Sequence, residues 1–134
     1  MAVNKEQDLY APIIAGTIAE RWTIFRIEDG AYGKKPFDIA GIAPDGRGVG
    51  IEVKLVESVS SNHIPWSKCS EHQINWLREY SKYGAYALLA VYDRNEDKLK
   101  VFSIHKDNRE FDYYEMVLDK FKRWCGWSQL LNDD

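Results

Sequence analysis

Apolar residues recur at helix-like intervals in two parts of the chain. Between residues 4 and 22 they follow near-helical spacing, which predicts a helical segment that Asn4 is suited to cap. Pro12 and Gly16 interrupt this pattern, so we expect two short helices with Pro12 in the first position of the second. The stretch from Glu71 to Tyr83 keeps its apolar residues on one face and predicts another helix.

Other stretches are rich in β-branched and aromatic residues, and turn-forming residues separate them. They predict strands at Thr23–Ile27, Phe37–Ile42, Gly50–Val56, Tyr86–Tyr92 and Lys98–Ile104. The second and third strands should form a hairpin, and the fourth and fifth should pair in antiparallel fashion. Spacing after residue 112 predicts a last helix, Tyr113 to Trp124. This order of elements indicates an α/β or α+β fold, with a mixed central sheet covered by helices.

Length and composition indicate one globular domain over residues 1–134, because 45% of the residues are apolar and can form a core. No apolar run approaches the roughly 20 residues of a membrane span, and the beginning of the chain lacks a signal-peptide pattern. We therefore expect a cytoplasmic protein that does not contact membranes. In that setting Cys69 and Cys125 are expected to be reduced thiols.

The formal net charge of −3 counts against a protein that coats nucleic acid through phosphate attraction alone. It does not exclude a nuclease, because a metal site concentrates carboxylates while a local basic face holds the DNA.

Three residues on the predicted hairpin form a candidate catalytic group. Alternation along a strand puts Glu52 and Lys54 on one face and turns Val53 into the core. Asp38 precedes Glu52 with 13 residues between them, enough for one strand, a turn and the return strand, so the two carboxylates can face each other.

Converging carboxylates repel unless a hard divalent cation lies between them, and oxygen ligands suit Mg²⁺ or Mn²⁺. Lys54 beside such an ion could orient or deprotonate a water, or neutralise charge developing on a phosphate. The alternative is that Asp38 and Lys54 are solvated and that Glu52 pairs with a neighbour. The otherwise apolar strands around these charges count against that alternative.

These residues resemble a known family. Pro36-Phe37-Asp38 followed by Glu52-Val53-Lys54 looks like the PD-(D/E)XK nuclease signature. The segment from Ile64 to Leu77, which contains His72-Gln73-Ile74, is similar to the helix that follows the catalytic strands in RecU-type Holliday junction resolvases. Archaeal Hjc-type resolvases share this layout and a similar length. The resemblance spans roughly residues 4 to 105 and implies a restriction-endonuclease-like mixed central β-sheet flanked by helices.

The resemblance also implies a function: a homodimeric, Mg²⁺-dependent endodeoxyribonuclease, with Mn²⁺ as a substitute, that resolves four-way DNA junctions by phosphodiester hydrolysis. Asp38, Glu52 and the carbonyl of Val53 would bind the metal, Lys54 would assist the attacking water, and Gln73 would support the site.

The family takes a further metal-proximal acid from its first helix. Glu6, 32 residues before Asp38, fits the usual separation better than Glu20, 18 residues before it, but both stay open at this point.

Basic residues near the proposed site are candidates for phosphate contacts. They are Lys34, Lys35, Arg47, Lys68 and His72, although exposed cations are often only solvated and His72 also suits a helix face. Lys120, Lys122 and Arg123 are assigned to the polar face and last turn of the predicted terminal helix. The tryptophans Trp66, Trp76, Trp124 and Trp127 are expected in the core or an interface rather than stacked on bases.

Junction specificity is less determined by the sequence than nuclease activity. RecU-type proteins carry a long stalk before the catalytic Asp, and the loop from Gly30 to Lys35 is either a short analogue of it or a turn. Two alternatives therefore remain. One is a PD-(D/E)XK endonuclease with another DNA target, such as a restriction-like, repair or nicking enzyme, and the other is a non-catalytic DNA-binding module with the nuclease fold.

Overall fold

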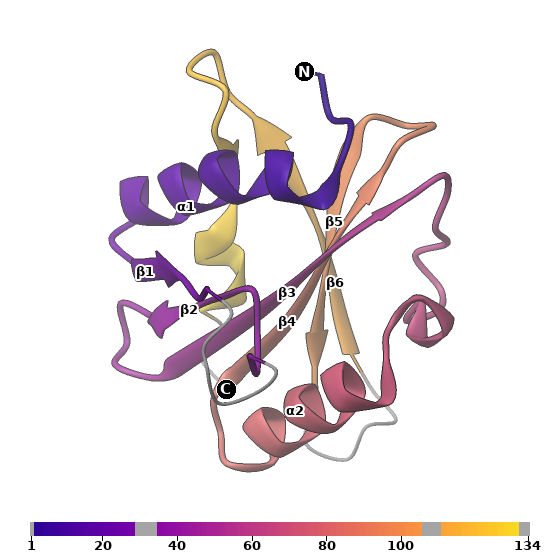
Figure 1. Ribbon diagram of the computed structural model, residues 1–134. Coiled ribbons are helices and arrows are strands. Elements are labelled where there is room, and N and C mark those ends of the chain that lie inside the picture. Colours follow the sequence, from indigo (N-terminus) through magenta and orange to yellow (C-terminus); the bar gives the residue numbers. More distant parts are fainter. Residues whose placement is uncertain (1, 29–34, 106–110, 132–134) are drawn as a thin grey trace.

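The strands form a single twisted sheet in which each strand lies beside the next one in the sequence. The computed structural model describes residues 2–28, 35–105 and 111–131, and Figure 1 shows it from the side of α1 and α2. The strands are β1 (Thr23–Arg26), β2 (Ile39–Ile42), β3 (Gly48–Val56), β4 (Tyr86–Asp93), β5 (Lys98–Ile104), β6 (Phe111–Leu118) and β7 (Trp124–Cys125). The helices are α1 (Tyr10–Ala19) and α2 (Glu71–Lys82), with short 3-10 turns η1 (Glu6–Leu9), η2 (Trp66–Lys68) and η3 (Trp127–Leu130).

Only β3 and β4 run parallel, and all other neighbouring strands are antiparallel, so the sheet is mixed. A parallel pair needs a crossover connection, and α2 supplies it. Ser70 caps this helix: its hydroxyl accepts from the Gln73 N–H, and the Gln73 side-chain carbonyl accepts from the Ser70 N–H. The predicted strands, the β2–β3 hairpin and this helix are confirmed.

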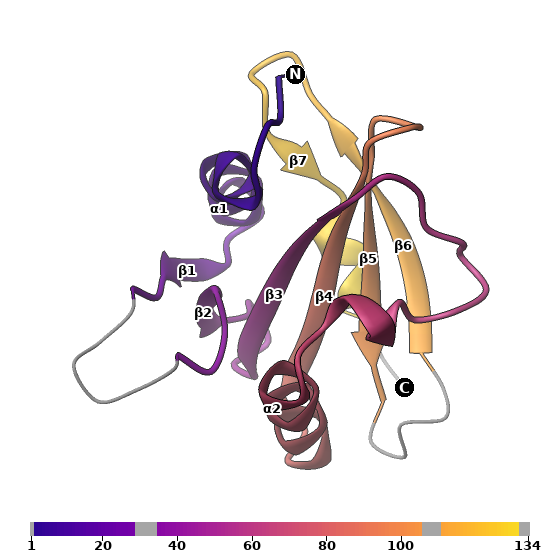
Figure 2. The same ribbon diagram turned by 45° about the vertical axis from the view of Figure 1, so that its right-hand side comes forward.

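Both faces of the sheet are covered, and each carries its own core. On one face Ile13 of α1 and Trp127 of η3 are fully buried with inward residues of the strands such as Ile51 and Val53. On the other face Leu77 of α2 packs in a cluster with Leu89 and Phe102 and their neighbours. Figure 2 shows the two helices at different ends of the molecule. Strand β4 is buried along its whole length, as its continuous apolar run predicts.

The predicted helix from Tyr113 to Trp124 is wrong, because this segment forms β6, a turn and β7. Strand β6 pairs with β5 in the register Leu99↔Met116 and Val101↔Tyr114. The outer edge of β5 presents backbone N–H and C=O groups that a helix could not satisfy, and β6 forms hydrogen bonds with these groups. Lys120, Lys122 and Arg123 therefore lie in or next to a hairpin turn and not on a helix.

The N-terminal segment is helical in two parts, as expected, but its boundary differs. The first part is the 3-10 turn η1, and Pro12 is the third residue of α1 rather than the first. Asn4 is not the cap residue; its N–H instead donates to the Asp8 carboxylate. Cys69 and Cys125 are both free thiols, as predicted. Among the described residues, no helix is long and apolar enough to cross a membrane.

Candidate active site

The candidate site begins where β3 continues past the end of β2. The last register pair of these strands is Ile39↔Ile51, so the edge of β3 beyond Ile51 has no strand partner from β2. Carboxylates take its place: the Val53 N–H donates to Asp38 Oδ2 at 2.9 Å, and the Leu55 N–H donates to Glu6 Oε2 at 3.1 Å. The N–H and C=O of a paired strand residue point to the same side, so the Val53 carbonyl is also directed toward this edge.

Asp38 and Glu52 lie close together and are almost completely buried. Asp38 immediately precedes β2, and its side chain is brought to β3 by the bond to Val53. Glu52 projects from the middle of β3, and the two carboxyl groups are hydrogen bonded to each other. The two residues are only 7% and 2% exposed, respectively. The alternative considered from the sequence was that Asp38 is solvated and that Glu52 pairs with a neighbour. The structure instead shows two buried carboxyl groups in contact.

The pair shares one proton. Burial, followed by the hydrogen bond to Asp38 and its negative charge, raises the pKa of Glu52 to about 9, although Lys54 and Lys35 oppose this shift. Burial acts in the same direction on Asp38, but hydrogen bonds outweigh it and hold the pKa of Asp38 below its usual value. At neutral pH Glu52 is therefore protonated, and its O–H donates a hydrogen bond to the Asp38 carboxylate.

Besides Glu52 and the Val53 N–H, two side chains hold the Asp38 carboxylate in place. The Lys35 ammonium lies 3.2 Å from Asp38 Oδ1, and the Tyr10 hydroxyl donates to the same carboxylate. His72 of α2 reaches across to the Lys35 carbonyl at 3.1 Å, which requires His72 Nε2 to carry its hydrogen. Helix α1 and the segment before β2 thus contact this carboxylate directly, and α2 supports it through Lys35.

Lys54 is half-buried, next to Glu52 on the same face of β3. The Cys69 thiol lies near Lys54, as the influence of the charges of Lys54, Glu52 and Glu6 on the pKa of this thiol indicates. Burial is the main cause that raises the pKa of Cys69 to about 11, so this thiol is protonated at neutral pH. Lys68, next to Cys69, is exposed at the border of the site.

The residues present fit a divalent cation. A carboxyl pair that keeps a proton only because both groups are buried together is a ready ligand for an ion that replaces this proton. Asp38, Glu52 and the Val53 carbonyl offer three oxygen donors at one edge of β3, the donor type that Mg²⁺ and Mn²⁺ prefer. Over the described ranges, no group of three or more His, Cys, Asp or Glu side chains is gathered for a metal, so Asp38 and Glu52 are the side-chain donors of this candidate site.

The structure separates the two candidates for the acid of the first helix. Glu6 reaches β3 next to the site through its bond to Leu55. Glu20 lies at the other end of α1, where its carboxylate accepts from the N–H groups of Gly126, Trp127 and Ser128 at the start of η3. Glu20 is therefore committed to holding the C-terminal segment.

The remaining predicted residues have mixed positions. Gln73 serves in the cap of α2, and among the described residues no hydrogen bond links it to Asp38, Glu52 or Lys54. Lys34 lies outside the described residues.

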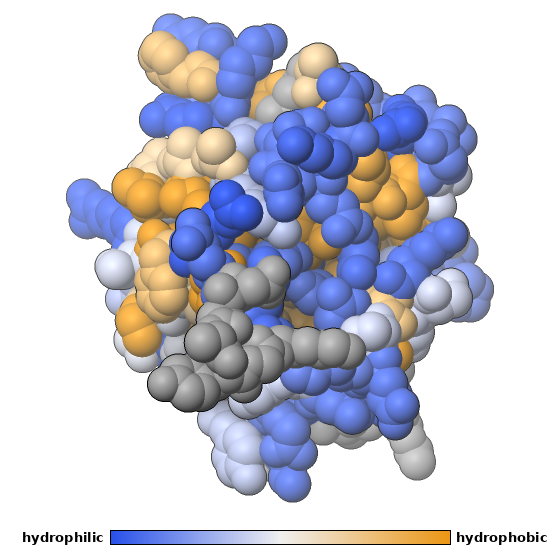
Figure 3. All heavy atoms as spheres, in the orientation of Figure 1, coloured by the Kyte–Doolittle hydropathy of each residue, from blue (hydrophilic) through white to orange (hydrophobic). Residues whose placement is uncertain are grey.

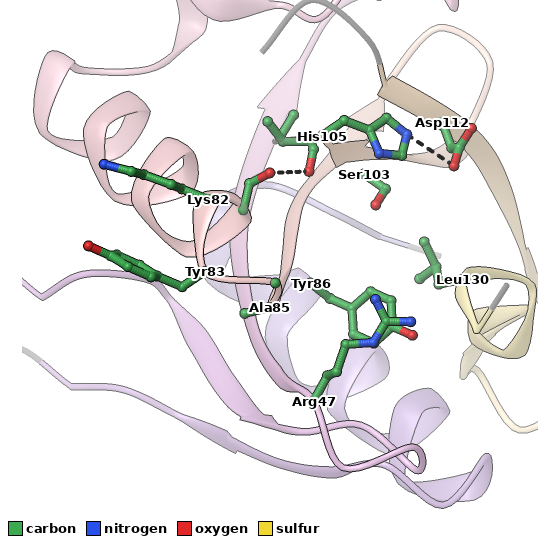
Figure 4. A pocket seen from close by; sticks show the side chains of 12 residues that line it. Arg47, Lys82, Tyr83, Ala85, Tyr86, Ser103, His105, Asp112 and Leu130 are labelled. Carbon is green, nitrogen blue, oxygen red and sulfur yellow. Dashed lines mark hydrogen bonds and ion pairs between the residues drawn. The ribbon is translucent and has the colours of Figure 1, made fainter. Parts of the chain in front are cut away.

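Arg47 precedes β3, roughly 16 Å along the strand from Glu52 at about 3.3 Å per residue. It lines a separate hollow of about 580 Å³, together with Lys82, Tyr86 and His105. In Figure 4 the Arg47 guanidinium lies against the ring of Tyr86, and the neighbouring side chains of His105 and Asp112 pair with each other.

Sequence reasoning missed Tyr10 and Cys69, and it gave Lys35 a different role. Tyr10 is only 7% exposed, and its hydroxyl points to Asp38. Its spacing of four residues from Glu6 would have placed both on one helical face, which is the signal that was available. Lys35 was expected to contact DNA, whereas here it pairs with Asp38. Cys69 carried no recognisable signal.

The comparisons with known proteins identify a fold. No protein-family model matches the chain, and no curated protein matches it. Among solved structures the chain is similar to Hjc, a Holliday junction resolvase from the archaeal hyperthermophile Archaeoglobus fulgidus, with a TM-score of 0.57 and 13% sequence identity. The alignment covers 94% of this chain and 99% of that one.

The protein therefore has a restriction-endonuclease-like fold, a mixed sheet with helices. Its particular variant is the fold of this archaeal resolvase, which confirms at the level of the fold the resemblance found in the sequence.

Proposed function

We propose that the protein is a divalent-metal-dependent endodeoxyribonuclease that resolves four-way DNA junctions. The observation that carries this proposal is the buried Asp38–Glu52 pair, which shares a proton beside Lys54 on a fold like that of Hjc. A structural role gives no reason to bury two carboxyl groups against each other, because the arrangement costs stability unless a cation or catalysis uses it.

In this proposal Asp38, Glu52 and the Val53 carbonyl hold Mg²⁺, with Glu6 as an additional acid at the rim. The bound ion would supply Lewis-acid activation of the scissile phosphate and of a water. Lys54 orients the attacking water or stabilises negative charge on the phosphate from its place beside Glu52. Tyr10 and Lys35 keep the Asp38 carboxylate aimed at the site, and the exposed Lys68 contacts a flanking phosphate.

The proposed active form is a homodimer, since paired cuts on a four-way junction require two sites related by symmetry. Support comes from exposed apolar side chains on neighbouring elements: Ile18 of α1, Phe25 of β1 and Ile42 of β2 are 53%, 56% and 49% exposed. The register Thr23↔Ile42 places Phe25 and Ile42 on one face of the edge of the sheet. Figure 3 shows hydrophobic surface on the side where these elements lie in Figure 1.

The test is cleavage of a labelled synthetic four-way junction and its matched linear duplex in Mg²⁺. Wild type is compared with Asp38→Asn and Lys54→Ala, and Lys98→Ala serves as a control because Lys98 is an exposed strand lysine away from the site that pairs with Glu115. We expect paired nicks on the junction alone. Asp38→Asn and Lys54→Ala should lower the rate by about a hundredfold or more, and Lys98→Ala should not change it.

Equal cleavage of junction and duplex would make the protein an endonuclease with another target. No cleavage of either DNA, with intact binding to them, would indicate a DNA-binding module that retains the nuclease fold.

A further inference from the structure

The turn between β6 and β7, residues 119 to 123, presents an exposed aromatic ring among cations. Phe121 is 64% exposed, and the Lys120 ammonium and Arg123 guanidinium lie 5.1 and 4.9 Å from its ring centroid. Lys120 and Lys122 on either side of it are also exposed. Neither core of the protein uses this ring. A large apolar side chain kept in water at the tip of a hairpin points to a binding role.

The turn is held in one shape by its own side chains. Asp119 Oδ1 accepts from the N–H groups of Phe121 and Arg123, each at 2.9 Å. Asp119 Oδ2 binds the Arg123 guanidinium through Nε and Nη2 at 2.9 and 2.8 Å. Lys122 takes the left-handed conformation, with φ of 60°. The ring is therefore presented by a preorganised loop, and little conformational freedom remains to be lost on binding.

The charge of the turn is opposite to that of the whole chain. Its three cations and one acid give a local charge of +2, whereas the chain has a formal net charge of −3. The Asp119 carboxylate is used by Arg123, and within the described ranges no ion pair involves Lys120 or Lys122. Two unpaired ammonium groups beside an open ring complement a polyanion that also offers flat apolar faces, and DNA has both features.

The position of the turn is fixed relative to the candidate site. Figures 1 and 2 place the turn at the same end of the molecule as the N-terminus. The segment that follows the N-terminus forms η1, from which Glu6 contacts β3. Helix α1 touches β7 directly: a Cβ added to Gly16 would lie 1.7 Å from the Trp124 carbonyl oxygen. The helix that carries Tyr10 into the site thus also supports the base of this hairpin. In Figure 3 the turn is the projection at the top left.

We propose that the β6–β7 turn is a second DNA contact, in which Phe121 stacks on a base exposed at a branch point while Lys120 and Lys122 bind flanking phosphates. This inference rests on the proposed function. A continuous duplex covers both faces of every internal base, whereas a branch point interrupts the stack and leaves a face open to an aromatic ring. The ring would therefore distinguish branched from linear DNA, and the lysines would bind both.

The experiment measures binding of the full chain to a four-way junction and to a linear duplex, both closed by the same hairpin loops, with Ca²⁺ in place of Mg²⁺. The junction carries the fluorescent base 2-aminopurine at the branch point. Phe121→Ala should bind the junction about tenfold more weakly and lose the fluorescence change, while duplex binding stays the same. Phe121→Trp should retain both properties. The double variant Lys120→Ala/Lys122→Ala should lower the slope of log K against log salt by about 2 on both DNAs.

Tyr83→Ala is the matched control. Tyr83 is 78% exposed with the Lys82 ammonium 5.7 Å from its ring centroid, but it follows α2 at the other end of the molecule (Figure 1), so its loss should leave junction binding unchanged.

The outcomes separate this inference from the proposed function. If wild type cleaves the junction and Phe121→Ala binds it equally well, the inference is wrong and the function stands. If wild type neither binds nor cleaves the junction, both are wrong. Phe121-dependent binding to vesicles of anionic lipid, without an effect on DNA, would assign the turn to a membrane surface and overturn the inference.

Discussion

The central feature at the residue scale is one proton held between Asp38 and Glu52. Glu52 has an ordinary pKa of 4.5 and a pKa of about 9 in the folded protein, because burial and the Asp38 carboxylate both disfavour its ionised form. The folded chain therefore retains a proton that the unfolded chain releases above pH 4.5. In the absence of a cation, this part of the folding free energy is fully present below pH 4.5 and is lost as the pH rises to about 9.

Glu52→Gln removes this titration while keeping the size of the side chain and its ability to donate to Asp38. In EDTA, the free energy of unfolding of this variant should exceed that of wild type by an amount that grows between pH 5 and pH 9. Urea unfolding followed by tryptophan fluorescence at several pH values measures it. A difference between the two proteins that is constant over this range would contradict a raised pKa for Glu52.

The core residues of the site could be predicted because strand alternation and hairpin geometry follow directly from sequence spacing. Asp38, Glu52 and Lys54 are brought together as expected. The partners that hold them could not be predicted in the same way. Lys35 and His72 meet through a contact between residues 37 positions apart, and Tyr10 reaches Asp38 because η1, which leads into α1, packs against β3. No local pattern encodes such contacts.

At the scale of elements, the loop that follows β3 is held by a buried ionic cluster. Lys100 of β5 pairs with Asp93 at 3.1 Å and with Glu96 at 2.8 Å, and it donates to the Val59 carbonyl. Asp93 also accepts from the Val59 N–H. Lys100 and Asp93 are only 3% and 0% exposed. This cluster joins the β4–β5 turn to the chain leaving β3, and so it fixes the end of the strand that carries Lys54.

Lys100→Met should destabilise the protein by about 3 kcal/mol, because it leaves the Asp93 carboxylate buried without a cation. The matched control is Lys98→Ala on the same strand, whose exposed pair with Glu115 at 3.5 Å should contribute less than about 1 kcal/mol. Chemical denaturation of both variants gives the comparison. Similar losses from the two substitutions would show that the buried cluster contributes no more than a surface pair.

The error over residues 113–124 illustrates why element type can be ambiguous in a sequence. Tyr114, Val117 and Leu118 fit helical spacing, but Tyr114, Met116 and Leu118 equally fit the alternation of a strand, and the structure packs these three against one core. The deciding factor is the open edge of β5, which lies outside the segment itself. Because the pairing of β6 with this edge also creates the β6–β7 turn, the exposed position of Phe121 could not be predicted from the segment alone.

At the scale of the whole molecule, the proposed function requires an acidic protein to bring a carboxylate site against the phosphates of DNA. With no cation bound, Asp38 carries a negative charge and Glu52 is protonated, so the pair contributes one of the two negative charges that the formal net charge of −3 assigns to it. That charge repels DNA, and a divalent cation that replaces the proton neutralises it, because two ionised carboxylates and the ion sum to zero. Asp38 also engages Lys35, whose charge is then not available to a phosphate.

This arrangement predicts opposite effects of two substitutions on DNA binding. In EDTA and low salt, Asp38→Asn should bind a four-way junction about fivefold more tightly than wild type, because it removes the charge and releases Lys35. Glu52→Gln should bind like wild type, since Glu52 is already neutral. Adding Ca²⁺ should strengthen binding by wild type but by neither variant. Fluorescence anisotropy measures all three affinities, and equal binding by Asp38→Asn and Glu52→Gln in EDTA would contradict the assignment of the charge to Asp38.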